Sequence, residues 1–558
     1  MKALGRFPLR STVSLWAAAL VLLAGCAATN PIPVPVTGER PRLVVMFVVD
    51  GLPQRQVVEY WDQMAPDGLK RFLDHGVWFS DAHYAHAVTE TAPGHATILT
   101  GAYPHRTGII ANEWRDPATG QREYCAADPS ATYIGHSTAK GEGTSPKNLK
   151  VESLGDVLKR LDARSKVIAI SGKDRGAIFP AGKAGTAYIY REQTGQFAST
   201  TYYMKEHPRW VNDFNAMKTA DSYFHKQWRP LLAESAYARS LPDERPWFAA
   251  GGKLPRTLGQ GQDAPGPLFY GEILATPFGD ELLLAFARAA IAGESLGRDD
   301  APDILVVSLS SHDYVNHAYG AESRISHDHV LYLDRALQDF FNDLDVAIGR
   351  DNYLAVLTAD HGFMPTPEFS RSLGRDAGRL NFGQMLARLN AGLTRKFGPG
   401  PWVLGMSAQG VVLNRTFMAQ KAASVAQVSE EARRLLLEER GIEVVYTRAE
   451  FESGSRAGAP AFESMRNAWH RDLSGDLQVG LKPYWMYGSG TTMTTHGSHH
   501  AYDTNVPILI YGPSWISPGR VDKPVEVVDI APTLARILRV PAPAACEGKL
   551  LPLGAAVR

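Results

Sequence analysis

Short runs of apolar, often β-branched residues alternate along the chain with longer amphipathic stretches. The run 43–49 (LVVMFVV) is apolar throughout, which is typical of a parallel strand buried on both faces. Further buried-strand candidates lie at 166–170, 303–309, 353–358 and 506–511, and apolar positions at helical spacing predict helices at about 66–75, 151–163 and 529–539. The pattern predicts an α/β fold in which a mostly parallel central sheet is flanked by helices on both faces.

Two long segments interrupt this rhythm, at about 183–300 and about 366–490. Both are rich in glycine, proline and aromatic residues and lack the alternation of strands and helices. We interpret them as cap or subdomain insertions in one domain that spans residues 41–558. The chain shows no fixed-period internal repeat.

The first 26 residues have the features of a targeting segment. A basic start precedes the apolar run 15–24, which is too short to span a bilayer comfortably. The stretch 23–26 (LAGC) resembles a bacterial lipobox, in which Cys26 would be acylated and become the new N-terminus. The alternative is an ordinary secretory signal with an incidental cysteine. Both interpretations predict export from the cytoplasm.

The next segment, 27–40, carries three prolines in a short polar stretch and suits an extended spacer between a lipid anchor and the domain. Ala27 stands where an aspartate would favour retention in the inner membrane. We therefore expect a periplasm-facing protein held at the outer membrane by its lipid anchor alone.

Composition limits the possible partners. The 58 basic and 58 acidic residues leave no formal net charge, so nothing global attracts the protein to nucleic acid. We expect small-molecule substrates and a monomer. Apart from Cys26, the chain has only Cys125 and Cys546, which an oxidising compartment would allow to pair. Two separate buried thiols are the alternative.

Acidic residues and histidines gather after the predicted strands. Asp50 follows the first strand, and Asp360 with His361 follows the strand 353–358. Asp313 and His317 follow the strand 303–309 at a spacing that one helical turn would place on one face, and His496 precedes the last strand. Carboxylates and imidazoles are ligands that zinc accepts, and six such groups suffice for two zinc ions.

Two further segments suggest phosphate chemistry. Thr91 stands directly before Ala92, Pro93 and Gly94, which favour a turn and a helix start. A zinc ion would make its hydroxyl a nucleophile, and the same side chain could cap the helix. Lys173 and Arg175, in an expected extended loop after the strand 166–170, offer two cations to a phosphoryl dianion.

Several motifs, in order, resemble the alkaline phosphatase superfamily, and within it the phosphate-irrepressible, PafA-like alkaline phosphatases. They are VVDG at 48–51, TAPGHATILTG at 91–101, Asn112 in NEW, SGKDRGA at 171–177, TADHG at 358–362 and HGSHHAYDTNVP at 496–507. The resemblance spans nearly the whole chain after the leader.

The resemblance implies a residue-by-residue assignment. Asp50, Thr91, Asp360 and His361 would surround one zinc ion, and Asp313, His317 and His496 would hold the other. Thr91 would attack phosphorus to give a phosphothreonine that water then hydrolyses, while Asn112, Lys173 and Arg175 hold the non-bridging oxygens. His499 and His500 occupy places where the family has other residues, and their contribution to the metal site is left open.

Alternative functions share part of this pattern. A nucleotide pyrophosphatase or phosphodiesterase of the same superfamily would use the same ligands, but the cation pair favours monoesters, which carry one more negative charge. A sulfatase is disfavoured because Thr91 lacks the C/S-x-P-x-R setting. A non-catalytic lipoprotein that binds carbohydrate or a protein partner is the alternative from a different class. We expect a zinc-dependent phosphate-monoester hydrolase.

Overall fold

The computed structural model describes residues 39–243, 245–407, 410–488 and 493–553. The predicted leader 1–26 with its lipobox Cys26, and the spacer up to residue 38, lie outside the described residues. Within the described part, no helix combines the length and the apolar character needed to cross a membrane.

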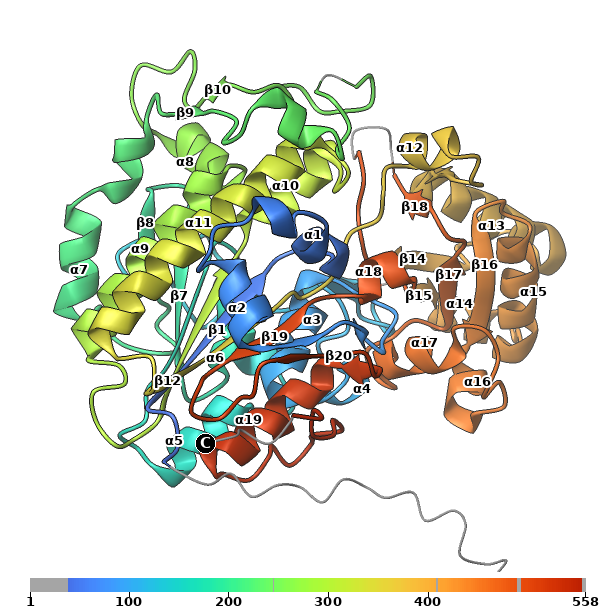
Figure 1. Cartoon of the computed structure of the whole chain (residues 1–558). Coiled ribbons are helices and arrows are strands. Elements are labelled where there is room, and N and C mark those ends of the chain that lie inside the picture. The colour runs from blue at the N-terminus through green and yellow to red at the C-terminus, as the bar shows by residue number, and fades with distance from the viewer. Residues whose placement is uncertain (1–38, 244, 408–409, 489–492, 554–558) are drawn as a thin grey trace, which may run out of the picture. The chain divides into compact units, whose positions relative to one another are not determined.

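A nine-stranded sheet forms the centre of the domain (Figure 1). Its strands lie in the order β20 (Gly519–Val521), β2 (Val77–Phe79), β19 (Ile508–Tyr511), β12 (Tyr353–Thr358), β1 (Leu43–Val49), β11 (Asp303–Leu309), β6 (Val167–Ser171), β7 (Thr186–Arg191) and β8 (Gln196–Ala198). The central strands from β12 to β7 are parallel, whereas β19 runs antiparallel to both of its neighbours and β8 antiparallel to β7. The predicted α/β class with a mostly parallel sheet is confirmed.

Helices pack on both faces of this sheet. The ring of Phe47 in β1 contacts Phe340 and Phe341 of α11 (Arg324–Ala347), with centroids 5.6 and 5.7 Å apart. The next residue, Val48, is in register with Ser308 of β11, whose hydroxyl contacts His95 of α3 (Thr91–Thr100). Because successive strand residues point to opposite faces, α11 and α3 cover opposite sides of the sheet.

The predicted helices are present with shorter bounds. They are α2 (Leu69–His75), α5 (Leu154–Leu161) and α19 (Ile530–Leu538). At the start of α5, Ser153 and Asp156 form a capping box, which begins this helix three residues later than its apolar spacing indicates. Other elements of the core are α1 (Gln54–Glu59), α4 (Pro104–Thr107), β4 (Glu113–Arg115), β5 (Arg122–Tyr124), α6 (Asp174–Ala181), α9 (Pro277–Glu294), α10 (Ser311–Tyr319) and α18 (Ala501–Thr504).

The prediction that residues 183–300 form an insertion is wrong for both ends of this segment. Strands β7 and β8, at its start, extend the central sheet, and α9, at its end, packs against β11 and α11. The described residues between them form short elements, which include α7 (Arg209–Ala216), β9 (Gln227–Trp228), β10 (Arg256–Thr257) and α8 (Pro267–Leu274). The sequence did not reveal β7, because glycine-rich turns flank it and because it joins the sheet only by pairing with β6.

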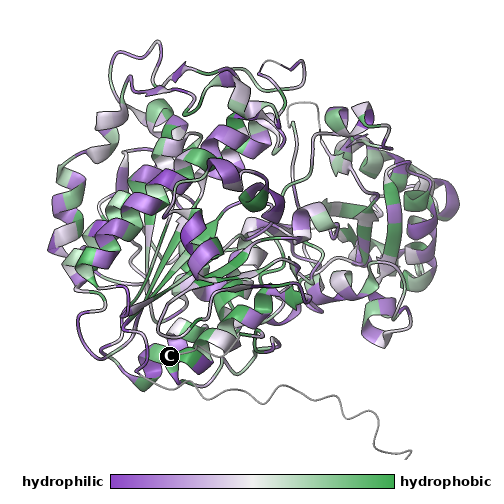
Figure 2. Ribbon diagram, in the orientation of Figure 1, coloured by the Kyte–Doolittle hydropathy of each residue, from purple (hydrophilic) through white to green (hydrophobic). Residues whose placement is uncertain are grey.

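The segment predicted as the second insertion, 366–490, contains a separate antiparallel sheet in the order β14 (Val403–Ser407), β15 (Gly410–Leu413), β17 (Leu477–Leu481) and β16 (Ile442–Thr447). Helices α13 (Phe382–Phe397) and α15 (Val425–Leu437) pack with it around a core that includes Leu389, Trp402 and Val428. Figure 2 shows these strands as hydrophobic and the outer helix faces as hydrophilic. We call residues 378–487 the subdomain.

The two cysteines of the domain do not form a disulfide. Cys125 is buried and Cys546 is partly buried, and both are free thiols. Of the two alternatives from the sequence, separate thiols are therefore correct, because the fold does not bring these side chains together.

Candidate active site

Four neighbouring parallel strands end at the same edge of the sheet, and their next residues form the centre of the site. In the order of the sheet, β12 is followed by Asp360, β1 by Asp50, β11 by α10 with Asp313, and β6 by Lys173. The carboxyl ends of parallel strands are the usual place for sites in open α/β sheets. The ligands predicted from strand ends therefore lie together.

The first group of candidate metal ligands is Asp313, His317 and His496. Oδ1 of Asp313 lies 3.3 Å from Nε2 of His317, one turn further along α10, and 3.5 Å from Nε2 of His496. Nδ1 of His317 faces the carbonyl oxygen of Thr494 at 3.0 Å, and Nδ1 of His496 faces that of Thr89 at 2.8 Å. Both rings thus direct Nε2 toward the carboxylate, as metal-binding histidines do.

The second group joins Asp50, Asp313 and His361, and Asp360 lies beside it. Nε2 of His361 is 3.4 Å from Oδ1 of Asp50 and 3.6 Å from Oδ2 of Asp360. The backbone N–H of Gly51 donates to Oδ1 of Asp360 at 3.0 Å. Gly51 has a φ of +72°, so the turn that leads the chain away from Asp50 favours glycine.

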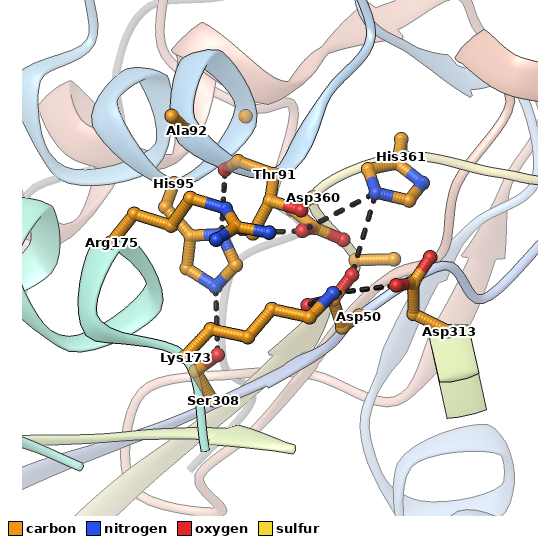
Figure 3. Close-up of polar contacts among 12 residues, drawn as sticks. Asp50, Thr91, Ala92, His95, Lys173, Arg175, Ser308, Asp313, Asp360 and His361 are labelled. Carbon is orange, nitrogen blue, oxygen red and sulfur yellow. Dashed lines mark hydrogen bonds and ion pairs between the residues drawn. The ribbon is translucent and has the colours of Figure 1, made fainter. Parts of the chain in front are cut away.

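Lys173 reaches between Asp50 and Asp313 (Figure 3). Its Nζ is 2.7 Å from Asp50 and 2.5 Å from Asp313. Burial alone would lower the pKa of Lys173, but the two carboxylates outweigh burial and raise it. Burial would likewise raise the pKa of Asp313, but His317 and Lys173 hold it below its ordinary value. Lys173 is therefore a fixed cation in the site.

The prediction that Lys173 and Arg175 lie in an extended loop is wrong. Only Lys173 is extended, as the N-cap of α6, and Arg175 lies in the first turn of that helix. Helix α6 starts at once after β6, so both cations reach the site from one helix start. Arg175 is partly buried, and its Nη1 lies 3.4 Å from the hydroxyl of Tyr124.

Thr91 is the first residue of α3 and is buried. The prediction that Thr91 caps this helix is wrong, because the N-cap residue is Glu90. The side chain of Glu90 makes no capping hydrogen bond. A side chain at Gly94 would come within 2.2 Å of the carbonyl oxygen of Asp360, so glycine lets the first turn of α3 pack directly on the Asp360 backbone. Asn112 adjoins Thr91, since its Oδ1 accepts from the N–H of Ala92 at 2.8 Å.

His95 is a positioning residue that the sequence analysis did not single out. It is fully buried, with Nδ1 2.8 Å from the carbonyl oxygen of Thr91 and 3.2 Å from Oδ2 of Asp360, and Nε2 2.8 Å from the hydroxyl of Ser308. It links α3, β11 and the end of β12 (Figure 3). Its spacing of four residues from Thr91, on the same helix face, was the available signal.

The open question about the adjacent histidines has a clear structural answer. His499 and His500 belong to a separate group with Glu443 of the subdomain, and not to the group around Asp313. His496 alone of the three is directed at Asp313.

A cleft of about 570 Å³ adjoins the ligand groups. Its lining includes Asn112, Trp114 and Arg122 of the core and Phe382 and Met406 of the subdomain. His317 and His496 also line it. The lining also includes Glu90 and Glu113, and Glu113 pairs with Arg122, so the cleft offers a surface of mixed apolar and charged side chains.

The chemistry of the donor set fits metal ions. Among the described residues, Oδ1 of Asp50, Oδ1 of Asp313, Oδ2 of Asp360 and Nε2 of His361 are buried without a hydrogen-bond partner. Buried carboxylate oxygens are costly unless paired or bound to a metal, and one lysine cannot neutralise three acids. His361 has a pKa raised to about 9 against the effect of burial, by Asp360 and Asp50, which reflects the same excess of negative charge.

Comparisons with known proteins agree with this picture. Residues 44–503 match the model of the type I phosphodiesterase / nucleotide pyrophosphatase family. The chain is 34% identical to the alkaline phosphatase PhoV of Synechococcus elongatus, over 94% of this chain and 95% of that protein. It is 33% identical to the alkaline phosphatase PafA of Elizabethkingia meningoseptica, over 94% of this chain and 96% of that protein.

Solved structures show the same likeness. The crystal structure of wild-type alkaline phosphatase PafA has a TM-score of 0.85 at 32% identity, and the match covers 92% of this chain and 99% of that one. A murine ectonucleotide pyrophosphatase / phosphodiesterase shares the fold at a TM-score of 0.51 and 11% identity.

Proposed function

Because the chain belongs to the type I phosphodiesterase / nucleotide pyrophosphatase family, we propose that it is a zinc-dependent phosphate-monoester hydrolase with Thr91 as its nucleophile. The resemblance to PafA-like alkaline phosphatases noted in the motifs is confirmed by relatives that match over nearly the whole chain. The observation that carries the proposal is the convergence of two ligand groups, a buried lysine and the start of α3 at one edge of the sheet.

Two zinc ions would supply Lewis acidity, held by Asp50, Asp360 and His361 on one side and by Asp313, His317 and His496 on the other. The chain itself positions the nucleophile: His95 donates through Nδ1–H to the carbonyl oxygen of Thr91 and so fixes the first turn of α3. The Thr91 hydroxyl loses its proton to solvent and its oxygen bonds to phosphorus, while the bond from phosphorus to the leaving oxygen breaks and that oxygen takes a proton from solvent. Water then attacks the phosphothreonine, which gives phosphate and restores the threonine hydroxyl.

Charge favours monoesters over diesters. Lys173 and Arg175 both reach the site from the start of α6. Lys173 is buried and Arg175 is partly buried, so they meet the non-bridging oxygens in an environment with little solvent. A diester has one charge fewer and gains less from this pair. Asn112 would donate its side-chain amide N–H to a third oxygen, since its Oδ1 already accepts from Ala92.

The experiment compares kcat/KM for an aryl phosphate monoester and its methyl diester with the purified, zinc-loaded protein. We expect monoester preference, and Thr91→Ala should lower monoester turnover by at least about 1,000-fold. Thr97→Ala, which removes a buried hydroxyl without a described hydrogen-bond partner from the same helix, is the matched control and should keep activity. Diester preference would point to the phosphodiesterase alternative, and absence of turnover would favour a binding protein.

We also propose that the protein is exported and attached to the outer membrane through an acylated Cys26. The support is the sequence of the leader, with its LAGC stretch, and the proline-rich spacer that follows. In a bacterial host, Cys26→Ser should move the protein from the membrane fraction to the soluble periplasmic fraction. An unchanged membrane fraction in the variant would contradict the anchor.

A further inference from the structure

A second cluster of metal-ligating side chains lies where the subdomain meets the segment after His496. It consists of Glu443, at the start of β16, with His499 and His500, which directly precede α18. One oxygen or nitrogen of each lies within 4.8 Å of the others. Oε2 of Glu443 is 3.7 Å from Nε2 of His499 and 4.0 Å from Nε2 of His500.

These separations suit an ion between the side chains. Zinc binds histidine nitrogen and carboxylate oxygen at about 2.0–2.2 Å, so two ligands of one ion lie between about 3.3 and 4 Å apart, depending on the angle between their bonds. Two histidines with one glutamate form a donor set typical of zinc, and three protein ligands leave a fourth position for water. Glu443 keeps 38% of its side chain exposed, so an ion can enter from solvent.

The surroundings leave the histidines available as ligands. Nδ1 of His499 is buried without a hydrogen-bond partner among the described residues, and a buried ring nitrogen left unpaired is costly unless an ion or water satisfies it. Burial lowers the pKa of His499 to about 4 and also lowers that of His500, which keeps both rings neutral, as ligation requires.

We propose that Glu443, His499 and His500 form a third divalent-metal site, of the zinc-binding class, outside the active site. The bound ion joins the subdomain sheet to the segment that carries His496, four residues before His500. Nε2 of His500 also lies 2.8 Å from the carbonyl oxygen of Leu481, and an ion at this nitrogen competes with that hydrogen bond. The affinity should therefore be lower than at the ligand groups around Asp313, and mild chelation should empty this site first.

Zinc counting tests the site independently of activity. The full-chain protein is stripped with a strong chelator, dialysed against graded free Zn²⁺, and analysed for metal per chain. Glu443→Gln, at an exposed position, removes one ligand without disturbing the core, and the triple variant Glu443→Gln/His499→Gln/His500→Gln removes all three. Both should bind one zinc ion fewer per chain than the wild-type protein.

The matched control is His75→Gln, which removes an exposed histidine of α2 and should leave the zinc count unchanged. If Glu443→Gln binds as many zinc ions as the wild-type protein, the three-residue site is overturned. Because the count does not depend on turnover, an inactive protein that still loses one ion in Glu443→Gln would contradict the proposed hydrolase and leave this site standing.

Discussion

At the scale of single residues, the position of Lys173 says most about the charge that the site would accept. It is nearly completely buried, with its Nζ in contact with carboxylates that follow two different strands. A buried lysine held charged in this way can neutralise excess charge on a phosphoryl group as well as on the acids around it. We therefore propose that its side chain distinguishes substrates by charge.

Replacement of Lys173 by methionine should change substrate preference. We expect kcat/KM for an aryl monoester to fall by about 100-fold and that for the methyl diester by less than about 10-fold, because the dianion loses more electrostatic stabilisation. Both rates are measured on zinc-loaded protein. Lys183→Met, at an exposed position after α6, is the matched control. An equal loss for both substrates would assign Lys173 a purely structural role.

At the scale of elements, a buried ion pair ties α2 to α11. Arg71 exposes 1% of its side chain and contacts Asp67 and Asp345 at 2.5 and 2.8 Å, and its Nη1 donates to the hydroxyl of Tyr353. The guanidinium also packs on the ring of Phe341, 4.6 Å from its centroid. The arginine thus holds a helix on the sheet through charge and packing together.

Arg71→Met should lower the free energy of unfolding by about 3 kcal/mol, because Asp345 is 15% exposed and loses its buried cation, keeping only Arg350, which is 56% exposed, as a charged partner. Arg55→Met in α1 is the comparison, since Arg55 and its partner Glu59 are 43% and 32% exposed, and its effect should stay within about 0.5 kcal/mol. Urea unfolding of both variants measures the difference. Equal midpoints would contradict the structural role of Arg71.

Asp280 joins α9 to the start of α10 and makes stability depend on pH. Its Oδ1 accepts from the N–H of Ser311, and burial raises the pKa of Asp280 to about 7. The folded state therefore binds a proton more tightly than the unfolded chain, whose aspartate has a pKa near 3.8. The stabilisation is full below about pH 4 and is lost as pH rises through about 7.

Asp280→Asn keeps this position neutral at every pH. Relative to the wild-type protein, the variant should therefore gain stability as pH rises from about 4 to 8, by up to about 4 kcal/mol. Urea unfolding at several pH values measures this difference, and Asp339→Asn, at an exposed position of α11, controls for the loss of an acidic residue. A difference that does not change with pH would contradict the shifted pKa.

At the scale of the whole molecule, the active-site ligands come from segments far apart in the chain. Asp50, Thr91, Lys173, Asp313, Asp360 and His496 lie on different elements that fold around one edge of the sheet. Folding brings Asp50, Asp313 and Asp360 together with Lys173, which contacts two of them. Ions that bind these acids in the folded protein stabilise the whole domain.

Removal of metal should therefore lower the unfolding temperature. Zinc at about 1,000 times its dissociation constant should add about 4 kcal/mol to the free energy of unfolding, because the unfolded chain lacks the assembled site. Thermal unfolding with chelator and after addition of zinc measures the change. Asp313→Asn should reduce the gain, since Asp313 belongs to both ligand groups. An unfolding temperature that does not respond to zinc would argue against the metal centre.

Local patterns along the chain were enough to predict the strands β1, β11 and β12 and the acidic residues that follow them. Continuous apolar runs that end in Asp or Asp-His are local features, and parallel strands bring such ends together. Contacts between residues far apart in the chain could be seen only in the tertiary structure. Strand β7 pairs with β6, Lys173 contacts Asp313, 140 residues away, and His499 lies beside Glu443. Local periodicity specifies which residues a segment buries, but long-range packing specifies against which residues they are buried.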